Sequence, residues 1–291
     1  MFILGLTGSI GMGKSTVATI FRRFNSPVYD SDFVVHELLG RNGAAVELVA
    51  GIFEGVVSCG KVDRKALGNQ VFKDAVEEKG LFYPPDPASQ GSCFLGGNLA
   101  ENAGGPKALK YGVTKDYVLN LEVVLPTGEI IWTGANVLKN STGYNLTQLL
   151  VGSEGTLGII TRIVFKLIPL PQKSITLLIP FKSSEDAYKA VSLIFMAGIT
   201  PCALEFIERD AIDWALKYSD VKLDIEDDVD AHLLVEVDGN DIEALYVDCE
   251  NIQEVVSQFE CGEITLADND SHKDMLWKLR RSVAEAVKSN S

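Results

Sequence analysis

The sequence lacks a surplus of basic residues, because 26 Lys and Arg stand against 40 Asp and Glu, with a net charge of −14. A protein that binds nucleic acid needs cations that displace the counterions of the phosphates. This composition therefore argues against a nucleic-acid partner, and any anionic ligand must be held by a few local cations.

Long apolar runs are also absent. No stretch approaches the ~20 apolar residues that span a bilayer. Met1 to Leu6 lead directly into a glycine-rich turn, without the basic region and cleavage site of a secretory leader. The sequence therefore predicts no membrane partner and a cytoplasmic location.

Paired cysteines are missing as well. The five cysteines are odd in number and show no CxxC spacing, and none of the three histidines is paired with them in sequence. A reactive thiol needs a nearby base. We interpret the cysteines as reduced and mostly structural. With 291 residues and 46% hydrophobic content, the chain is long enough for two domains.

A phosphate-binding pattern opens the chain. In "FILGLTGSIGMGKST" a short apolar run, typical of a buried parallel strand, precedes Gly8, Gly13, Lys14 and Ser15 at the GxxxxGK[ST] spacing. The glycines let backbone N–H groups face phosphate oxygens, the lysine reaches the β/γ-phosphates and the serine binds Mg²⁺. The pattern favours phosphate binding over a chance glycine turn.

Two carboxylates follow in "PVYDSDFVVHELL", which predicts a short strand, a turn and a helix. Asp30 and Asp32 come at the end of that strand, where open α/β sheets place ligands. Either residue could accept a proton from an attacking hydroxyl, or Asp30 could cap the helix. The residues alone leave both interpretations open.

These segments, with "GAAVELV" and "GKVDRKALGNQVFKD", together resemble the first part of dephospho-coenzyme A kinase over about a quarter of the chain. The resemblance implies an α/β P-loop fragment over residues 1–75, Asp32 as the catalytic base that takes the proton of the ribose 3′-hydroxyl, and Arg64 on the acceptor side. It implies Mg-ATP, with Ser15 as the metal ligand. The ATP-binding residues are then Gly11, Met12, Gly13, Lys14, Ser15 and Thr16.

The kinase pattern stops near Ala75. "VFKDAVEE" fits the end of a helix, but "GLFYPPDPAS" then supplies a Pro84-Pro85 break and a loop. The family's later strands and lid arginines do not follow.

Beyond the break, three segments are rich in turn residues. "GGNLAENAGGPKALKYGVT" allows close approach of backbone to a ligand, "LEVVLPTGEII" predicts a hairpin with its turn at Pro126 to Gly128, and "GSEGTLGIIT" is a glycine turn before a strand. Taken alone, each glycine-rich turn is as compatible with a plain loop as with a ligand-binding loop.

As a set, with "GLFYPPDPAS", they resemble the FAD-linked oxidase family that includes glycolate oxidase, D-lactate dehydrogenase and D-2-hydroxyglutarate dehydrogenase, over about three quarters of the chain. The resemblance implies an α+β FAD-binding (PCMH-type) half-domain over residues 76–172 and FAD as cofactor. The implied flavin contacts are Asp86, Pro87, Ala88, Ser89, Gln90, Gly91, Ser92, Glu101, Asn102, Ala103, Gly104, Glu154, Gly155, Thr156, Leu157, Gly158, Ile159 and Ile160.

From Ser174 onward, strands and helices alternate. The predicted elements are the strand "SITLLIPF", the helix "SEDAYKAVSLIFMAG" ending at Gly198, the strands "CALEFIE" and "HLLVEVDG", and the helix "DIEALYVDCENIQEVVSQF". The pattern agrees with the family's substrate-covering domain, and we expect a ferredoxin-like α+β domain over residues 173–291. The acidic stretch Asp220–Asp230 is expected to be a solvated loop.

Arg280 lies in a predicted helix, "MLWKLRRSVAEAV". A cation on an exposed helix is usually only solvated. The resemblance implies instead that Arg280 binds the substrate carboxylate, which a guanidinium can hold through two parallel hydrogen bonds.

The chain thus has the pattern of a chimera of two incomplete parents. An FAD-dependent oxidoreductase acting on a 2-hydroxy acid is the leading hypothesis. The sequence does not identify its electron acceptor. Because each parent is cut inside its core, we expect that the activity could be lost. ATP-dependent dephospho-coenzyme A kinase activity, or ATP binding alone, is the second. A remnant without catalysis is the third. The sequence assigns no metal and no catalytic base to the flavin part.

Overall fold

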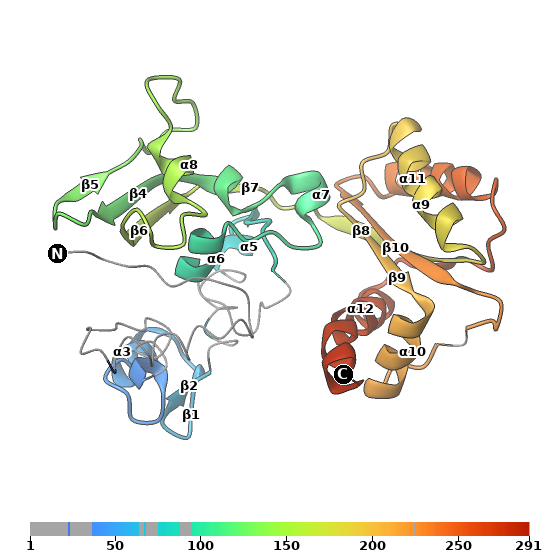
Figure 1. The fold of residues 1–291 in the computed structure, drawn as a ribbon, viewed down its shortest axis with the longest axis horizontal. Coiled ribbons are helices and arrows are strands. Elements are labelled where there is room, and N and C mark those ends of the chain that lie inside the picture. Colours follow the sequence, from blue (N-terminus) through green and yellow to red (C-terminus); the bar gives the residue numbers. More distant parts are fainter. Residues whose placement is uncertain are drawn as a thin grey trace. The chain divides into compact units, whose positions relative to one another are not determined.

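The computed structural model describes residues 23, 37–63, 67, 75–87, 95–223 and 225–290. The P-loop residues, Asp32, Arg64, Cys93 and the predicted flavin contacts Ala88 to Ser92 lie outside the described residues. The chain divides into two compact units, each considered by itself (Figure 1). The first comprises Met1–Tyr83, Ser89–Ala103 and Val113–Pro169, and the second comprises Pro84–Ala88, Gly104–Gly112 and Leu170–Ser291.

The first unit contains short elements around one three-stranded sheet. Its described elements are α3 (Val46–Ile52), β1 (Val57–Ser58), β2 (Lys61–Val62), α5 (Ala75–Glu77), β3 (Leu81–Phe82), α6 (Leu95–Glu101), the 3-10 helix η2 (Thr114–Tyr117), β4 (Val118–Val124), β5 (Ile130–Trp132), α8 (Leu146–Leu150), β6 (Ile159–Phe165) and β7 (Ile168–Pro169).

The sheet of this unit has the order β5-β4-β6. Strands β4 and β5 form the predicted antiparallel hairpin, in which Val124 lies opposite Ile130. The N–H of Gly128 donates to Leu125 O, and Gly128 has a φ of 87°, which glycine adopts without strain. The hairpin prediction is confirmed. A small apolar core lies under the sheet, formed by Leu99, Val118, Leu121, Val123, Leu150 and Val151.

The second unit is an α+β domain. Its elements are α7 (Ala108–Tyr111), β8 (Lys173–Phe181), α9 (Ser184–Met196), β9 (Ala203–Glu208), α10 (Arg209–Tyr218), β10 (Ala231–Gly239), α11 (Ile242–Val256), β11 (Thr265–Ala267) and α12 (Asp270–Asn290). The sheet has the order β11-β8-β10-β9, which is the strand order of a ferredoxin-like sheet. All its strand pairs are antiparallel.

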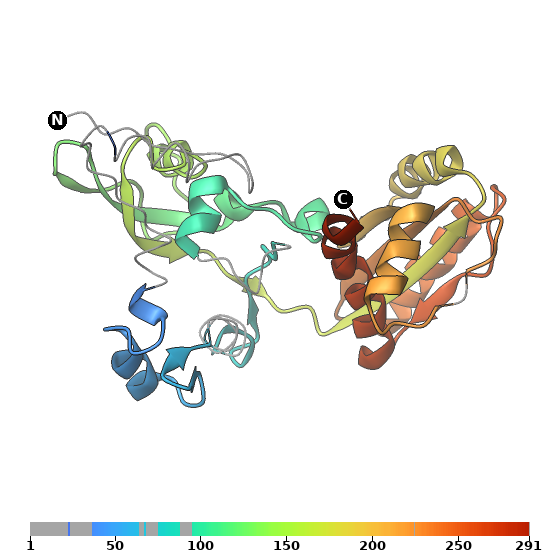
Figure 2. The ribbon, with the colours of Figure 1, turned by 60° about the horizontal axis from the view of Figure 1, so that its bottom comes forward.

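Side chains along β10 point alternately to the two faces of this sheet, and apolar core lies on both faces. Leu233, Val235 and Val237 face α9 and α11, whereas Leu234 faces Leu276 of α12. Helices α10 and α12 cover that second face (Figures 1 and 2). Each such buried side chain stabilises the fold by roughly 1.5–3 kcal/mol.

The end of α9 follows its sequence signal. Ala187 and Ile194 are fully buried on one side of the helix. Gly198 has a φ of 85° and its N–H donates to Phe195 O, so the glycine ends the helix where it was predicted to end.

The segment between β9 and β10 differs from the prediction. Helix α10 was not predicted there, although Ile212 and Ala215 are fully buried against α12. In the acidic stretch that follows, Val221 and Val229 are buried, so it is more than a solvated loop. Its carboxylates Asp220 and Asp228 pair with Lys278 and Lys182.

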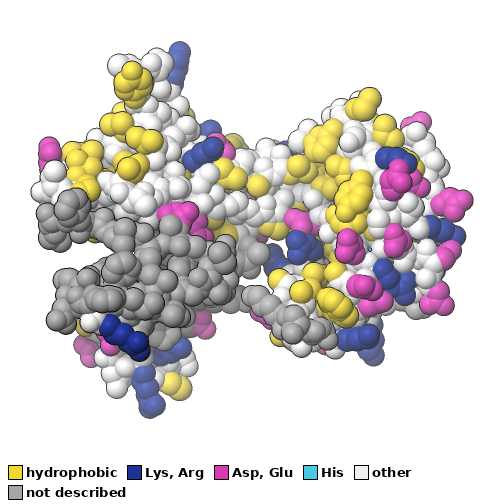
Figure 3. Space-filling view, viewed as in Figure 1, with side chains coloured by type: hydrophobic (Ala, Val, Ile, Leu, Met, Phe, Trp, Pro, Cys, Tyr) yellow, Lys and Arg dark blue, Asp and Glu magenta, His cyan; other side chains and the backbone are white. Residues whose placement is uncertain are grey.

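The surface of the second unit is of mixed charge. On the face shown in Figure 3, acidic and basic side chains lie interspersed over this unit. Among the described residues no helix has both the length and the apolar character needed to cross a bilayer.

Candidate functional site

Two of the predicted flavin segments meet in the first unit. The N–H of Gly152 donates to Leu99 O at 2.8 Å, and the N–H of Glu154 donates to Ala100 O at 3.0 Å. These bonds lay the turn that contains Glu154, Gly155 and Thr156 beside the end of α6, where Glu101, Asn102 and Ala103 lie. The structure therefore brings together segments that are about fifty positions apart.

Two residues of these segments have left-handed backbone. Asn102 has a φ of 51° and Glu154 a φ of 52°, and neither is glycine. Such conformations cost of order 1–3 kcal/mol and cluster at ligand sites. The side chain of Asn102 supports its own turn, because Oδ1 accepts from the N–H of Lys115 at 2.9 Å.

The remaining predicted contacts of this turn belong to the start of β6. Leu157 and Ile159 are exposed, at 41% and 61%. Gly158 has a packing reason of its own, since a Cβ there would come within 2.6 Å of Val123 Cγ1. The two exposed apolar side chains are available to a flat apolar ligand, whereas Ile160 packs against the core of the unit.

Among the described residues, three other predicted flavin contacts lie in the second unit, namely Asp86, Pro87 and Gly104. Their two segments touch at Gly105, where a Cβ would lie 2.1 Å from Asp86 O. Asp86 Oδ2 also lies 3.7 Å from Arg281 Nη2 of α12. This places a predicted flavin residue next to the helix that carries Arg280.

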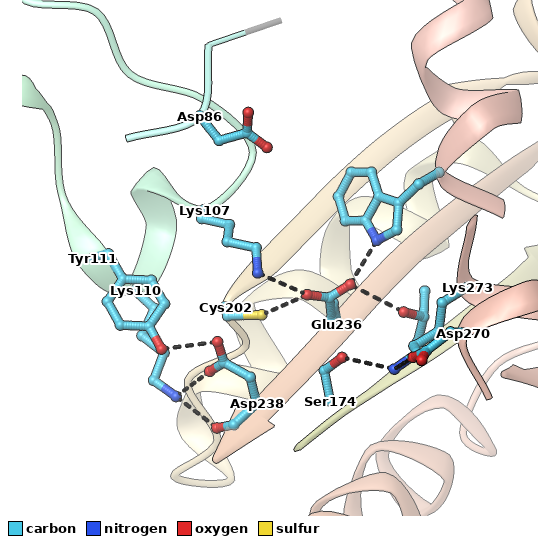
Figure 4. A network of polar contacts seen from close by, with 12 residues as sticks. Asp86, Lys107, Lys110, Tyr111, Ser174, Cys202, Glu236, Asp238, Asp270 and Lys273 are labelled. Carbon is cyan, nitrogen blue, oxygen red and sulfur yellow. Dashed lines mark hydrogen bonds and ion pairs between the residues drawn. The ribbon is translucent and has the colours of Figure 1, made fainter. Parts of the chain in front are cut away.

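A buried carboxylate is the centre of the polar network in the second unit (Figure 4). Glu236 of β10 is only 4% exposed. Its Oε1 accepts from Lys107 Nζ and Cys202 Sγ, both at 3.3 Å. Its Oε2 accepts from Trp277 Nε1 at 2.5 Å and from Thr176 Oγ1 at 3.1 Å. Four segments of the unit thus meet on one side chain.

A second buried carboxylate follows two positions along the same strand face. Asp238 is 6% exposed. Lys110 Nζ donates to its Oδ1 at 2.6 Å and to its backbone oxygen at 2.9 Å, and Tyr111 Oη donates to its Oδ2 at 2.8 Å. The two carboxylates of β10 therefore hold helix α7 and the residues before it (Figure 4).

The network sets the charge states of its members. Burial lowers the pKa of Lys107, but the neighbouring groups together, Glu236 first and Asp238 among them, outweigh burial, and the pKa of this lysine is raised overall. Burial, with Glu236 beside it, raises the pKa of the Cys202 thiol far above its ordinary value. Lys107 is therefore a cation and Cys202 an inert thiol, in agreement with a structural cysteine.

Arg280, the predicted carboxylate ligand, is held on α12 by a strand residue. Its Nε and Nη2 donate to Glu205 Oε2 of β9 at 2.8 and 2.6 Å. The side chain is 31% exposed. Arg281, the next residue, lies over the ring of Trp277 at 6.0 Å. Arg280 is thus oriented by a carboxylate, as a binding arginine needs to be, and is not simply solvated.

The two histidines in the described part of the chain, His232 and His272, form no catalytic pair. His232 is 3% exposed, and its Nδ1 has no hydrogen-bond partner. Burial, with Arg209 nearby, lowers its pKa to about 4, so the ring is neutral at physiological pH. Among the described residues no cluster of His, Cys, Asp and Glu could hold a metal ion.

Sequence reasoning missed the carboxylate network. The strand "HLLVEVDG" was recognised, but not the meaning of Glu236 and Asp238 within it. Two acidic residues at i and i+2 lie on the same face of a strand, and in an otherwise apolar strand they indicate buried partners. That spacing was the available signal, but it does not identify Lys107, Lys110 or Trp277.

Models of two protein classes match the chain. Residues 68–134 match the family described as "FAD binding domain", and residues 170–291 match "FAD linked oxidases, C-terminal domain". Residues 2–84 match "Dephospho-CoA kinase". The two-part resemblance is confirmed. The matched ranges overlap over residues 68–84, where the sequence is compatible with both classes.

Individual relatives also match the part of the chain that resembles FAD-linked oxidases. The chain is 41% identical over 235 residues to a D-lactate dehydrogenase of Anaerostipes hadrus, covering 79% of this chain and 49% of that protein. It is 42% identical over 213 residues to the glycolate oxidase subunit GlcD of Bacillus subtilis, covering 73% and 45%. The chain spans about half the length of these curated relatives.

A solved structure shows the same fold. An alkyldihydroxyacetonephosphate synthase superposes with a TM-score of 0.61 at 21% identity, over 78% of this chain and 42% of that one. Together with the matching domain model at residues 68–134, this confirms the predicted FAD-binding (PCMH-type) fold.

Proposed function

We propose that the larger part of this chain is an FAD-dependent oxidoreductase module that acts on a 2-hydroxy acid. The observation that carries the proposal is the match of residues 68–134 and 170–291 to FAD-linked oxidase domains, with relatives named D-lactate dehydrogenase and glycolate oxidase. A bound flavin would supply the acceptor for the hydride that leaves the α-carbon of the substrate.

The residues present fit such a cofactor. The left-handed backbone at Asn102 and Glu154, in two adjoining segments, is the kind of strained geometry that a ligand site retains. Exposed Leu157 and Ile159 offer apolar surface to a ring system. We assign flavin contacts to these segments and to Asp86, Pro87 and Gly104, and extend the assignment to Ala88–Ser92, which lie outside the described residues.

Arg280 is assigned to the carboxylate of the substrate. Both contacts of its guanidinium to the protein go to one oxygen of Glu205, through Nε and Nη2. Glu205 fixes the plane of the guanidinium, and a planar donor group is suited to a carboxylate.

Flavin titration tests the proposal. FAD fluorescence and visible absorption are followed as purified protein is added, and D-lactate and glycolate are then added without oxygen. Binding, followed by bleaching of the oxidised flavin band, is the expected result. Arg280→Lys should bind FAD equally but bleach more slowly at low substrate concentration. A protein that leaves FAD free in solution would refute the module.

A second candidate function is favoured by the match of residues 2–84 to dephospho-coenzyme A kinase. We propose Mg-ATP binding at Gly11–Thr16, with Ser15 on the metal, Asp32 as base and Arg64 on the acceptor side; all of these lie outside the described residues. Phosphate transfer to dephospho-coenzyme A that is lost in Lys14→Ala would support it. Equal ATP binding by the Lys14→Ala variant would contradict it.

A further inference from the structure

Glu236 lies where four segments of the second unit meet. Its two oxygens accept from Lys107 before α7, Thr176 on β8, Cys202 before β9 and Trp277 on α12. Figure 4 shows Lys107 and Cys202 reaching the carboxylate of Glu236 from different segments. None of the four contacts is between neighbours in the sequence.

Only an ionised carboxylate suits this position. Two oxygens offer about four acceptor sites, and four donors are present. A glutamine has the same shape, but its NH₂ group is a donor and would face two other donors. Lys107 supplies the compensating charge for a group that is 4% exposed. The site is therefore built for the charge of Glu236 and not only for its volume.

Two of the donors are near neighbours, in sequence, of residues assigned to the proposed active site. Lys107 is three residues after Gly104, which is assigned to the flavin. Trp277 is three residues before Arg280, which is assigned to the substrate, and residues at i and i+3 share one side of a helix. We propose that Glu236 is a positioning residue that fixes the flavin segment at Gly104 relative to helix α12. This role rests on the proposed oxidoreductase function.

Asp238 provides the comparison within the same strand. It holds Lys110 and Tyr111, which belong to α7, and among the described residues no hydrogen bond joins it to α12. Loss of its charge should loosen the flavin segment alone, whereas loss of the Glu236 charge should loosen both. A comparison of the two carboxylates therefore distinguishes a residue that positions both the flavin segment and helix α12 from a residue that only attaches the flavin segment.

The expected effect on catalysis follows from the geometry of transfer. A displacement of about 1 Å between reacting groups can reduce a rate by about 100-fold. Glu236→Gln should therefore lower kcat per bound flavin by about 10- to 100-fold. Glu236 acts through Lys107 and Trp277 and is not itself a catalytic residue.

The first test measures amide hydrogen exchange in the chain without added flavin. Glu236→Gln should raise exchange about tenfold in residues 104–112 and also in α12. Asp238→Asn should raise it in residues 104–112 only. Asp228→Asn, which removes an exposed ion pair of the same unit, is the control and should raise neither. Unchanged exchange in either segment of Glu236→Gln would overturn the proposal.

A milder substitution tests the same proposal if Glu236→Gln fails to fold. Trp277→Phe keeps the apolar packing and removes one donor. It should raise exchange in α12 while residues 104–112 keep the wild-type rate. Exchange that rises equally throughout β8 and β10 would show general destabilisation and would count against positioning.

The second test uses the flavin. If the wild type binds FAD, kcat is divided by the bound flavin, so that unfolded protein does not lower the value. An unchanged kcat per flavin in Glu236→Gln would refute positioning while the oxidoreductase function stands. If the wild type binds no FAD, the oxidoreductase function fails, and the exchange experiment still decides whether Glu236 joins the two segments.

Discussion

Gly105 is the position at which the structure makes its most direct prediction. A Cβ added there would lie 2.1 Å from Asp86 O and 2.5 Å from Asp86 C. Both are backbone atoms, so no side-chain rotation relieves the clash. The segments that contain Asp86 and Gly104 would have to separate by about 1 Å for the contact to reach an ordinary distance.

Overpacking of this kind costs typically 1–3 kcal/mol. For a chain of this size, 1 kcal/mol corresponds to about 2–4 °C in the melting temperature. Gly105→Ala should therefore lower the melting temperature of the second unit by roughly 2–12 °C. It should also weaken FAD binding, because the two separated segments are both assigned to the flavin.

The assay is thermal and urea unfolding followed by tryptophan fluorescence in a background in which Trp132 of the first unit is replaced by Phe, so that Trp214 and Trp277 report on the second unit. Gly239→Ala is the matched control in that unit. A Cβ at Gly239 would meet Leu245 Cδ2 at 3.5 Å, which is ordinary contact. If Gly105→Ala unfolds at the same urea concentration as Gly239→Ala, the close approach of the two segments is refuted.

Three further predictions address single groups. Arg280→Lys should raise KM for a 2-hydroxy acid about tenfold or more, because a charged hydrogen bond contributes about 1.5–3 kcal/mol; steady-state kinetics with FAD measures this. Burial lowers the pKa of His232 from its ordinary 6.5 to about 4. Between these two pH values the unfolded chain binds a proton that the folded chain does not. The free energy of unfolding should therefore fall by about 3 kcal/mol as the pH drops from 6.5 to 4. Urea midpoints across this range should fall less in His232→Leu. Iodoacetamide should label exposed Cys59 in the native protein and buried Cys202 only after unfolding, as mapped by mass spectrometry.

Contrary outcomes are equally specific. An unchanged KM in Arg280→Lys would remove this residue from the substrate site. Equal slopes of the urea midpoint against pH for the wild type and His232→Leu would mean that the imidazole is not buried and neutral. Rapid labelling of Cys202 in the native protein would contradict its burial beside Glu236.

Local patterns predicted those elements whose own residues carry the signal. The hairpin at Pro126 to Gly128 follows from apolar strands around a turn that glycine adopts easily. Helix α9 follows from its apolar stripe and ends at Gly198. Helix α10 was missed because its apolar positions, Ile212 and Ala215, lie beside an acidic stretch that dominates the local composition.

The sequence by itself determined the two-part character of the chain, since contiguous motifs carry it: the P-loop on one side of Pro84-Pro85 and the glycine segments on the other. It also determined strands β8, β9 and β10 and helices α9, α11 and α12 of the second unit, because hydrophobic periodicity is local; the short strand β11 was missed.

Only the tertiary structure decided which charges meet. Arg280 pairs with Glu205 across 75 positions, and Lys110 pairs with Asp238 across 128. No local spacing specifies such pairs, because they depend on how the strands align in the sheet and on which face α7 and α12 pack. Burial then converts ordinary surface residue types, such as Glu236 and Lys107, into a network with fixed charges.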